Sequence, residues 1–282
     1  MNQVPGIKLN NGTIMPQLGY GVWQVPDAEA EQAVGTALEA GYRSIDTASI
    51  YGNETGTGKA IAASGVPREE LFVTTKLWNG KSETWGRDNV LREFDSSLAK
   101  LGLDDVDLYL IHWPRPMRED FVAIWKTFEE IAASGRAKAV GVSNFRPADL
   151  ERLGAESSLV PAVNQIELHP LLPQGELRAL HARHGIATEA WSPLGQGKDL
   201  LTLPAVTAIA AKHGRSAAQV VLRWHLQLGN VVIPKSVTPS RIRENLDVFG
   251  FELDAEDIAA LDALGAGSAG RRIGPDPAEF DF

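Results

Sequence analysis

The chain alternates between short β-rich runs and amphipathic helical stretches, and this alternation occurs eight times. The β-rich runs lie near residues 18–22, 43–46, 71–75, 106–112, 137–142, 162–167, 186–191 and 230–233. Helical stretches separate them near residues 27–40, 53–64, 87–101, 119–134, 147–155, 174–184 and 216–228, with an extra helix near 204–213. Parallel strands need a long crossover connection, which is usually a helix, so this order predicts an α/β fold with a parallel sheet.

Eight strand–helix units in about 230 residues favour a closed (β/α)8 barrel, or TIM barrel, over an open doubly wound sheet. Asn10-Asn11-Gly12 lies between two short apolar runs and predicts an N-terminal β-hairpin before the barrel. Residues 240–247 and 254–264 predict extra C-terminal helices, followed by a loop over 265–282. No linker or internal repeat interrupts this pattern, so we expect residues 1–282 to form a single domain.

The charge and the residue usage exclude several classes of partner and site. The formal net charge of −9 repels nucleic acid and anionic membranes, so an anionic ligand needs its own local basic pocket. The chain has no cysteine, which excludes disulfides, thiolate metal ligands and a cysteine nucleophile. The N-terminal residues contain no apolar export segment, and no apolar run approaches the length of a spanning helix. We therefore expect a cytoplasmic monomer with no nucleic-acid or membrane partner.

Polar residues end three consecutive β-rich runs, at the end of a barrel where active sites of this fold lie. Asp46 ends the second run, Lys76 follows the third and His112 ends the fourth. Tyr51 follows Asp46 by five residues, in the loop after the second run. Because neighbouring strands lie about 5 Å apart, we expect these four side chains to converge.

The four residue types make a coherent proton donor. A free tyrosine has a pKa of about 10, and an adjacent lysine ammonium favours the phenolate and lowers that pKa. A buried lysine needs a counter-charge, which Asp46 supplies, and a neutral His112 can orient a carbonyl oxygen by a hydrogen bond. Each residue alone also fits a structural ion pair or a packing role. Their convergence favours a site that protonates a polarised carbonyl.

Seven motifs, four of which contain one of these residues, are distributed over nearly the whole chain. They are Gly41–Ala48, Tyr51–Glu54, Thr74–Trp78, Leu108–Pro114, Gly141–Phe145, Val163–Pro170 and Ile233–Val237. With them the chain resembles the aldo-keto reductase superfamily and, within it, the bacterial 2,5-diketo-D-gluconic acid reductases. The resemblance implies a (β/α)8 barrel that binds NADPH across the carboxyl ends of its strands and transfers a hydride to an aldehyde or ketone. It makes Tyr51 the general acid, Lys76 and Asp46 the residues that tune it, and His112 the residue that orients the substrate.

The phosphate site does not follow a dinucleotide-binding glycine motif. Gly56-Thr57-Gly58 lacks the third glycine and does not follow a strand. Barrels commonly bind phosphate after strands seven and eight, where this chain has a basic turn before a helix N-terminus. The candidate residues there are Lys235, Ser236, Val237, Thr238 and Arg241. A solvated basic turn is the alternative interpretation.

The resemblance assigns roles at this adenine end of the cofactor. The residues that it places at the 2′-phosphate are Lys235, Ser236 and Arg241. Those that it places beside the adenine are Glu244 and Asn245. With these basic residues, we expect NADPH or NADP to be preferred and NADH to bind more weakly. The reductases that the chain resembles can carry an arginine at the position of Thr238, so we expect this preference to be smaller than a fuller set of basic residues would give.

The resemblance also assigns the nicotinamide end. The residues that hydrogen-bond the carboxamide are Ser143, Asn144 and Gln165. Trp191 stacks on the nicotinamide ring, where a tyrosine is commoner. The loop that crosses the pyrophosphate contains Ser192, Leu194 and Gln196, and a plain surface turn is the alternative interpretation of this loop.

Tryptophans follow several of the predicted strands and are expected to wall an apolar substrate cleft. Together with His112, the expected substrate-binding residues are Trp23, Trp78 and Trp113. Arg271 and Arg272 in the tail are candidates for binding a substrate carboxylate. Trp125 and Trp224 lie on apolar helix stripes and are predicted core residues.

The sequence therefore predicts an NADPH-dependent reductase of small carbonyl compounds, such as 2,5-diketo-D-gluconate or methylglyoxal-like carbonyls. The alternative is a non-catalytic NADPH-binding barrel that senses redox state. No metal site is expected, since the chain has no His-Glu-x-x-His motif or other ligand cluster. Residues 141–145 lack the second glycine of a nucleophile elbow, which argues against a serine hydrolase.

Overall fold

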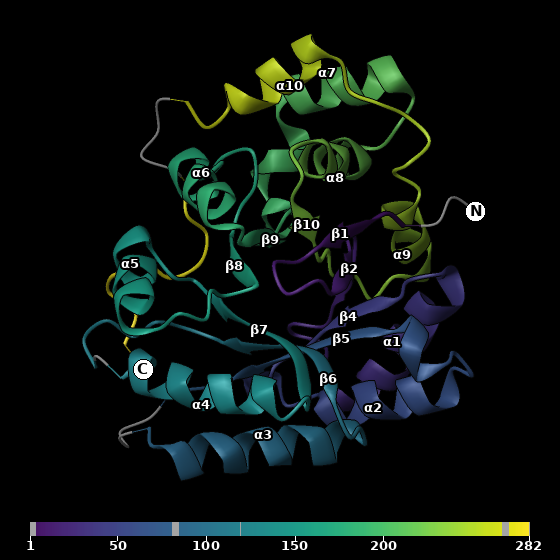
Figure 1. Ribbon diagram of the computed structural model, residues 1–282. Coiled ribbons are helices and arrows are strands. Elements are labelled where there is room, and N and C mark those ends of the chain that lie inside the picture. The colour runs from purple at the N-terminus through teal and green to yellow at the C-terminus, as the bar shows by residue number, and fades with distance from the viewer. Residues whose placement is uncertain (1–3, 81–84, 119, 267–270, 282) are drawn as a thin grey trace.

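A parallel sheet of eight strands forms the centre of the protein (Figure 1). The computed structural model describes residues 4–80, 85–118, 120–266 and 271–281. The strands are β3 (Tyr20–Gly21), β4 (Ser44–Asp46), β5 (Phe72–Leu77), β6 (Val106–Ile111), β7 (Ala137–Ser143), β8 (Val163–Glu167), β9 (Ala187–Trp191) and β10 (Val231–Val232). They are hydrogen-bonded in chain order from β3 to β10, as expected when each crossover returns the chain to the next place in the sheet.

The first and last strands meet and close the sheet into a barrel. Leu18 forms a parallel bridge with Val232. The Gly19 amide donates to the Val232 carbonyl at 2.8 Å, and the Val232 amide donates to the Gln17 carbonyl at 3.0 Å. The predicted (β/α)8 barrel is therefore confirmed. Strands β3 and β10 are shorter than predicted because only a few residues pair along this closing seam.

Helices surround the barrel and cover its outer face (Figure 1). They are α1 (Asp27–Ala40), α2 (Glu54–Ala63), α3 (Arg87–Leu101), α4 (Phe121–Ala133), α5 (Pro147–Glu156), α6 (Gly175–His184), α7 (Pro204–His213), α8 (Ala217–Gln227), α9 (Pro239–Leu246) and α10 (Ala255–Asp262). Each begins and ends within about two residues of its predicted range, because apolar residues at helical spacing face the sheet or a neighbouring helix. Residue 119 of one predicted helix, and residues 267–270 and 282 of the predicted tail, lie outside the described part of the chain.

Short 3-10 helices, which the sequence pattern did not predict, shape several loops. They are η1 (Ser49–Tyr51), η2 (Arg68–Glu70), η3 (Gly195–Gly197) and η4 (Asp199–Thr202). Two of them, η1 and η3, lie in loops that follow the carboxyl ends of β4 and β9. Such one-turn helices are too short to leave a periodic hydrophobic pattern in the sequence.

The N-terminal hairpin closes one end of the barrel. Strands β1 (Gly6–Lys8) and β2 (Ile14–Pro16) pair antiparallel, as predicted, and Gly6 lies opposite Pro16. Leu9 and Met15 belong to a buried cluster with Phe72 and Leu108 at the beginnings of β5 and β6. The hairpin therefore plugs the amino ends of the strands and leaves the carboxyl ends for a binding site.

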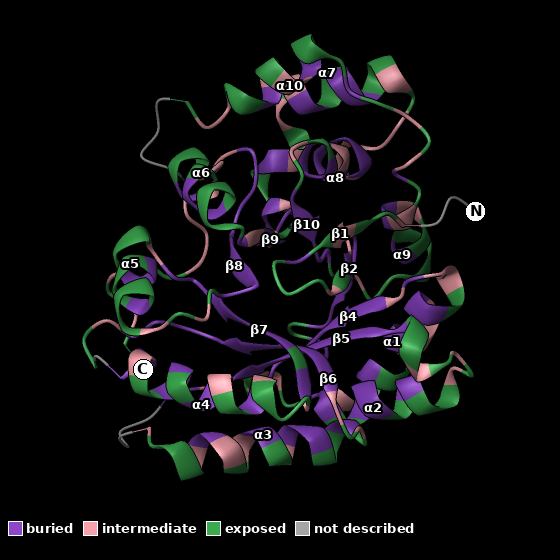
Figure 2. Cartoon of the chain, viewed as in Figure 1, coloured by how far each residue is buried: buried purple, intermediate pink, exposed green. Residues whose placement is uncertain are grey.

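The main hydrophobic core lies between the barrel strands and the helices, where buried residues follow the inner faces of the helices (Figure 2). Trp125 on α4 and Trp224 on α8 are fully buried, as predicted. The Trp224 indole nitrogen donates to Asp262 at 2.8 Å, so its one polar atom is satisfied. Among the described residues, no helix has the length and apolar content needed to span a membrane.

Candidate active site

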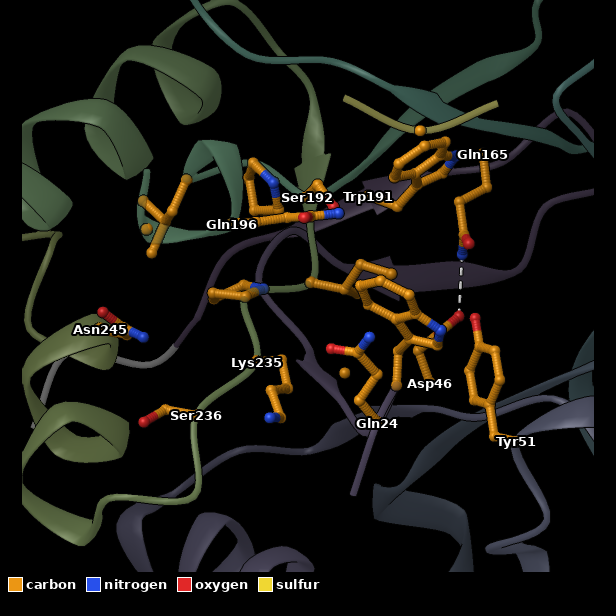
Figure 3. Close-up of a pocket in the computed structure, with 18 of the residues that line it drawn as sticks. Gln24, Asp46, Tyr51, Gln165, Trp191, Ser192, Gln196, Lys235, Ser236 and Asn245 are labelled. Carbon is orange, nitrogen blue, oxygen red and sulfur yellow. Dashed lines mark hydrogen bonds between the residues drawn. The ribbon is translucent and has the colours of Figure 1, made fainter. Parts of the chain in front are cut away.

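A cleft of about 840 Å³ lies at the carboxyl ends of the strands. Figure 3 shows Asp46 and Tyr51 on one side of this active-site cleft and Ser236 and Asn245 on the other. The residues predicted for a cofactor that line it are Ser143, Asn144, Gln165, Trp191, Ser192, Leu194, Gln196, Lys235, Ser236, Val237, Thr238, Arg241, Glu244 and Asn245. Those predicted for the substrate that line it are Trp23, Trp78, His112 and Trp113. The fold thus brings the two predicted groups together in one cleft.

Lys76 and Asp46 form a buried ion pair beneath this cleft. Asp46 ends β4 and Lys76 lies near the end of β5, on adjacent strands of the sheet. Lys76 Nζ donates to Asp46 Oδ1 at 2.6 Å and to the Thr47 carbonyl at 2.9 Å. Burial alone would lower the pKa of Lys76, but the charge of Asp46, the neighbouring Tyr51 and the hydrogen bond to Asp46 together outweigh burial and raise that pKa. The lysine therefore stays an ammonium ion at neutral pH.

Tyr51 lies on η1, next to this ammonium. Lys76 Nζ is 5.1 Å from the centroid of the Tyr51 ring. Burial raises the pKa of Tyr51; Lys76 opposes the rise and Asp46 adds to it. Lys76 lowers the pKa of Tyr51, as expected, but desolvation of the phenolate outweighs this effect, and Asp46 partly offsets the charge of the ammonium, so that the pKa is raised overall. Tyr51 is a protonated phenol at neutral pH and has a proton to give.

His112 packs against Tyr51 at the end of β6. The two ring centroids are 5.7 Å apart in an edge-on arrangement, and the Trp78 ring centroid is 5.3 Å from His112 in a similar arrangement. Burial, with a smaller contribution from Lys76, holds the pKa of His112 well below its usual range. The imidazole is therefore neutral at pH 7, so one of its ring nitrogens carries a hydrogen that can be donated and the other can accept.

Asn144 holds the end of β7 against two neighbouring segments. Its side-chain nitrogen donates to the His112 carbonyl at 3.0 Å and to Ser143 Oγ at 3.1 Å. Its side-chain oxygen accepts a hydrogen bond from the Trp191 indole at 2.8 Å. The backbone of Asn144 adopts a left-handed conformation with φ of 65°, which asparagine tolerates better than most residues. Ser143, Asn144 and Trp191 therefore form one connected group beside His112.

Gln165 joins the Lys76–Asp46 pair to a carboxyl group that the sequence analysis missed. Its Nε2 donates to Asp46 Oδ2 at 2.8 Å, drawn as the dashed line in Figure 3. The same nitrogen donates to Glu189 Oε2 at 2.8 Å. A charged residue within an otherwise small and apolar β-rich run was the available signal for Glu189.

The far part of the cleft carries local positive charge on an acidic protein. Lys235 follows β10 and Arg241 lies on the first turns of α9. In the part of the chain that the structure describes, neither forms a salt bridge with a carboxylate. Ser236 Oγ accepts from the Thr238 amide at 3.1 Å, which shapes the turn before α9. Two unpaired cations beside a helix N-terminus fit an anionic group such as a phosphate.

Known proteins share the sequence pattern of this chain. The sequence pattern of the Aldo/keto reductase family matches residues 8–266. The chain belongs to the aldo/keto reductase family. It is 57% identical over 278 residues to an aldo-keto reductase of Mycolicibacterium smegmatis, covering 99% of this chain and 98% of that protein. It is 50% identical to the methylglyoxal reductase DkgA of Yersinia pestis, covering 99% of each chain.

A solved structure supports the same family. The crystal structure of a mutant of Gox0644 in complex with NADPH matches with a TM-score of 0.93 and 46% identity, covering 100% of both chains. This likeness extends over the full length of both chains.

The C-terminal tail of this aldo/keto reductase contributes cleft residues that the sequence analysis did not identify. Gly274, Pro275 and Phe280 line the cleft, and the Phe280 ring centroid is 4.4 Å from that of Trp113. Further lining residues that were missed are Gly21, Gln24, Ile50, Leu201, Ser216, Ala217 and Ala218. They carry no chemical motif, and only the folding of the chain brings them to the cleft.

The tail arginines lie elsewhere than expected. Neither Arg271 nor Arg272 is among the residues that line the cleft, and Arg272 Nη1 lies 3.7 Å from Glu167 Oε2. The buried Glu167 carboxylate also accepts hydrogen bonds from the amides of Ile273 at 2.6 Å and Gly274 at 3.0 Å. Because a buried carboxylate requires such donors, Glu167 draws this part of the tail toward itself.

Proposed function

We propose that this aldo/keto reductase uses NADPH to reduce small aldehydes and ketones to alcohols, with Tyr51 as the proton donor. The observation that carries the proposal is the buried Lys76–Asp46 pair next to Tyr51, in a cleft that extends to the cations Lys235 and Arg241. The NADPH complex of the related Gox0644 structure supports the same cofactor for this chain.

The residues that line the cleft fit a dinucleotide with a 2′-phosphate. Lys235, Ser236 and Arg241 would hold the phosphate, and Ser143, Asn144 and Gln165 would hold the carboxamide of the nicotinamide. The backbone of residues 195–197 is left-handed, with φ between 57° and 69°, and Gln196 and Gly197 of this turn line the cleft. When bound, the nicotinamide supplies the hydride for the carbonyl carbon.

The protein then handles one proton. Tyr51 donates its phenolic proton to the carbonyl oxygen as charge develops there, and Lys76 stabilises the phenolate that remains. Asp46 keeps Lys76 charged in its buried position. Neutral His112 donates a hydrogen bond that orients the carbonyl. NADPH oxidation across a panel of 2,5-diketo-D-gluconate, methylglyoxal and aliphatic and aromatic carbonyls tests the proposal, and turnover with none of them contradicts it.

The substrate class that we propose is small dicarbonyls and sugar-derived ketones. Trp23, Trp78 and Trp113 would give the cleft apolar walls near His112, and the tail residue Phe280 packs on Trp113. The name of the Yersinia pestis relative, a methylglyoxal reductase, supports a small dicarbonyl.

Arg241→Ala is expected to raise the KM for NADPH by about 10- to 100-fold, because a charge-assisted hydrogen bond contributes about 1.5–3 kcal/mol. The KM for NADH should change by less than about twofold, since NADH lacks the phosphate. Arg243→Ala, on the same helix but outside the cleft lining, is the matched control. Steady-state kinetics with both cofactors would measure the change. An equal loss with NADPH and NADH would argue against phosphate binding by Arg241.

Gly274→Ala is expected to lower kcat/KM by about 10- to 100-fold, since small misplacements in a site of this kind cost that much. A Cβ at this position would overlap Cη2 of the Trp191 indole, so either the tail or the ring must move. Gly154→Ala on α5 is the control, because a Cβ there meets no atom within 4 Å. Measuring kcat/KM of both variants would test whether the reaction requires Trp191 in its present position. A Gly274→Ala variant with the same kcat/KM as Gly154→Ala would contradict this requirement.

A further inference from the structure

Glu189 is a buried carboxyl group inside the barrel that the proposed reaction does not yet use. It lies in the middle of β9, opposite Gln165 on β8, and is fully buried. Its Oε2 accepts from Gln165 Nε2, and the same nitrogen donates to Asp46 Oδ2, both at 2.8 Å. One amide nitrogen therefore bridges Glu189 to the ion pair beside Tyr51.

The groups around Glu189 do not favour a second negative charge. The titratable groups whose charges act on Glu189 are Asp46 on β4 and Lys76 on β5. Glu189 in turn acts on Tyr51 on η1. Lys76 is the single cation among them, and it already binds Asp46 at 2.6 Å. Glu189 Oε1 has no hydrogen-bond partner within the described residues. Burial, reinforced by Asp46, raises the pKa of Glu189 to about 8.

We propose that Glu189 is a positioning residue for proton transfer from Tyr51, which works while Glu189 is a neutral carboxylic acid and slows when Glu189 ionises. This inference rests on the proposed function. When Glu189 is neutral, the charges of this group that act on Tyr51 are those of Asp46 and Lys76, which have opposite signs and opposite effects on the pKa of Tyr51. An ionised Glu189 adds a negative charge that raises the pKa of Tyr51, because it disfavours the phenolate that proton donation leaves.

A stability comparison tests the protonation state without any catalysis. Glu189→Gln keeps the side-chain shape and stays neutral at every pH. The native pKa of Glu189 lies above the ordinary value of 4.5, so the wild type loses stability relative to this variant as pH rises from about 4.5 to about 8. We expect the gap in urea unfolding midpoint, variant minus wild type, to widen over this range and stay constant above it. A gap that is the same at every pH would overturn the inference.

The pH profile of kcat tests the effect on the reaction. With each profile scaled to its own maximum, we expect wild-type kcat to fall between pH 7 and pH 9 by up to about tenfold, the limit for a single ionisation near pH 8 whose charged form is inactive. The Glu189→Gln profile should lose this alkaline limb. Glu54→Gln is the matched control, because Glu54 is buried, accepts from Thr75 Oγ1 at 2.7 Å and lies outside this hydrogen-bonded group; its profile should follow the wild type.

Superimposable wild-type and Glu189→Gln profiles from active enzymes would contradict the inference and leave the proposed function intact. Absence of turnover in the wild type would instead contradict the proposed function, while the urea comparison would still report on Glu189. If Glu189→Gln does not fold, infrared spectra of the wild type replace it. They should show a protonated carboxyl band that disappears between pH 7 and pH 9, and a band that is absent at pH 7 would overturn the inference.

Discussion

Tyr51→Phe is expected to lower kcat by about 10²- to 10⁴-fold, the usual contribution of a positioned general acid. The substitution removes one hydroxyl and keeps the ring that packs 5.7 Å from His112. The affinity for NADPH should stay within about twofold, because the proposed cofactor contacts lie on other residues. Stopped-flow turnover and NADPH fluorescence titration would measure the two effects separately.

Tyr109→Phe is the matched control for this variant. Tyr109 is fully buried on β6 between Phe94 and Phe128, and its hydroxyl has no hydrogen-bond partner among the described residues. Removing that hydroxyl should leave kcat unchanged. Near-normal turnover by Tyr51→Phe would show that another group gives the proton, and equal losses in both variants would point to a general structural effect.

Lys76→Met is expected to destabilise the protein by about 3–5 kcal/mol and to lower kcat as severely as the loss of Tyr51. It leaves Asp46 buried without its cation, and removing one partner of a buried ion pair has a cost of this size. It also removes the charge that stabilises the Tyr51 phenolate. Urea unfolding monitored by tryptophan fluorescence would measure the free energy of unfolding.

The double variant Asp46→Asn/Lys76→Met separates the two effects. It removes both charges, so most of the lost stability should return, because an uncharged pair of similar volume is often as stable as a buried ion pair. The reductase activity should not return. A single Lys76→Met variant as stable as the wild type would mean that the buried pair does not hold this part of the barrel together.

The strands, the helices and the catalytic residue candidates could be predicted because each depends on local order along the chain. The helix α3 shows its apolar face in sequence as Val90, Phe94 and Leu101, and the structure buries these residues. Asp46, Lys76 and His112 each stand at the end of a β-rich run, and parallel strands bring such ends to one edge.

Other features could not be predicted because they depend on contacts between distant residues. Gln165 reaches Asp46 across 119 positions in the sequence, and Glu167 binds the Gly274 amide across 107. The raised pKa of Tyr51 also depends on how completely the folded loops exclude water, which residue types alone do not reveal. The contact of Gln165 with Asp46 supports the role proposed for Glu189, and the contact of Glu167 with Gly274 positions the tail.

Transfer of deuterium from NADPH that carries deuterium at both C4 positions shows directly whether the protein reduces a carbonyl compound. The enzyme would be incubated with labelled NADPH and methylglyoxal or 2,5-diketo-D-gluconate, and the product analysed by mass spectrometry and NMR. For the proposed reaction, one deuterium is expected on the new alcohol carbon for each NADPH oxidised, and this transfer should be lost in Tyr51→Phe. Tight NADPH binding with no labelled alcohol from any carbonyl would contradict it and favour a non-catalytic barrel that senses redox state.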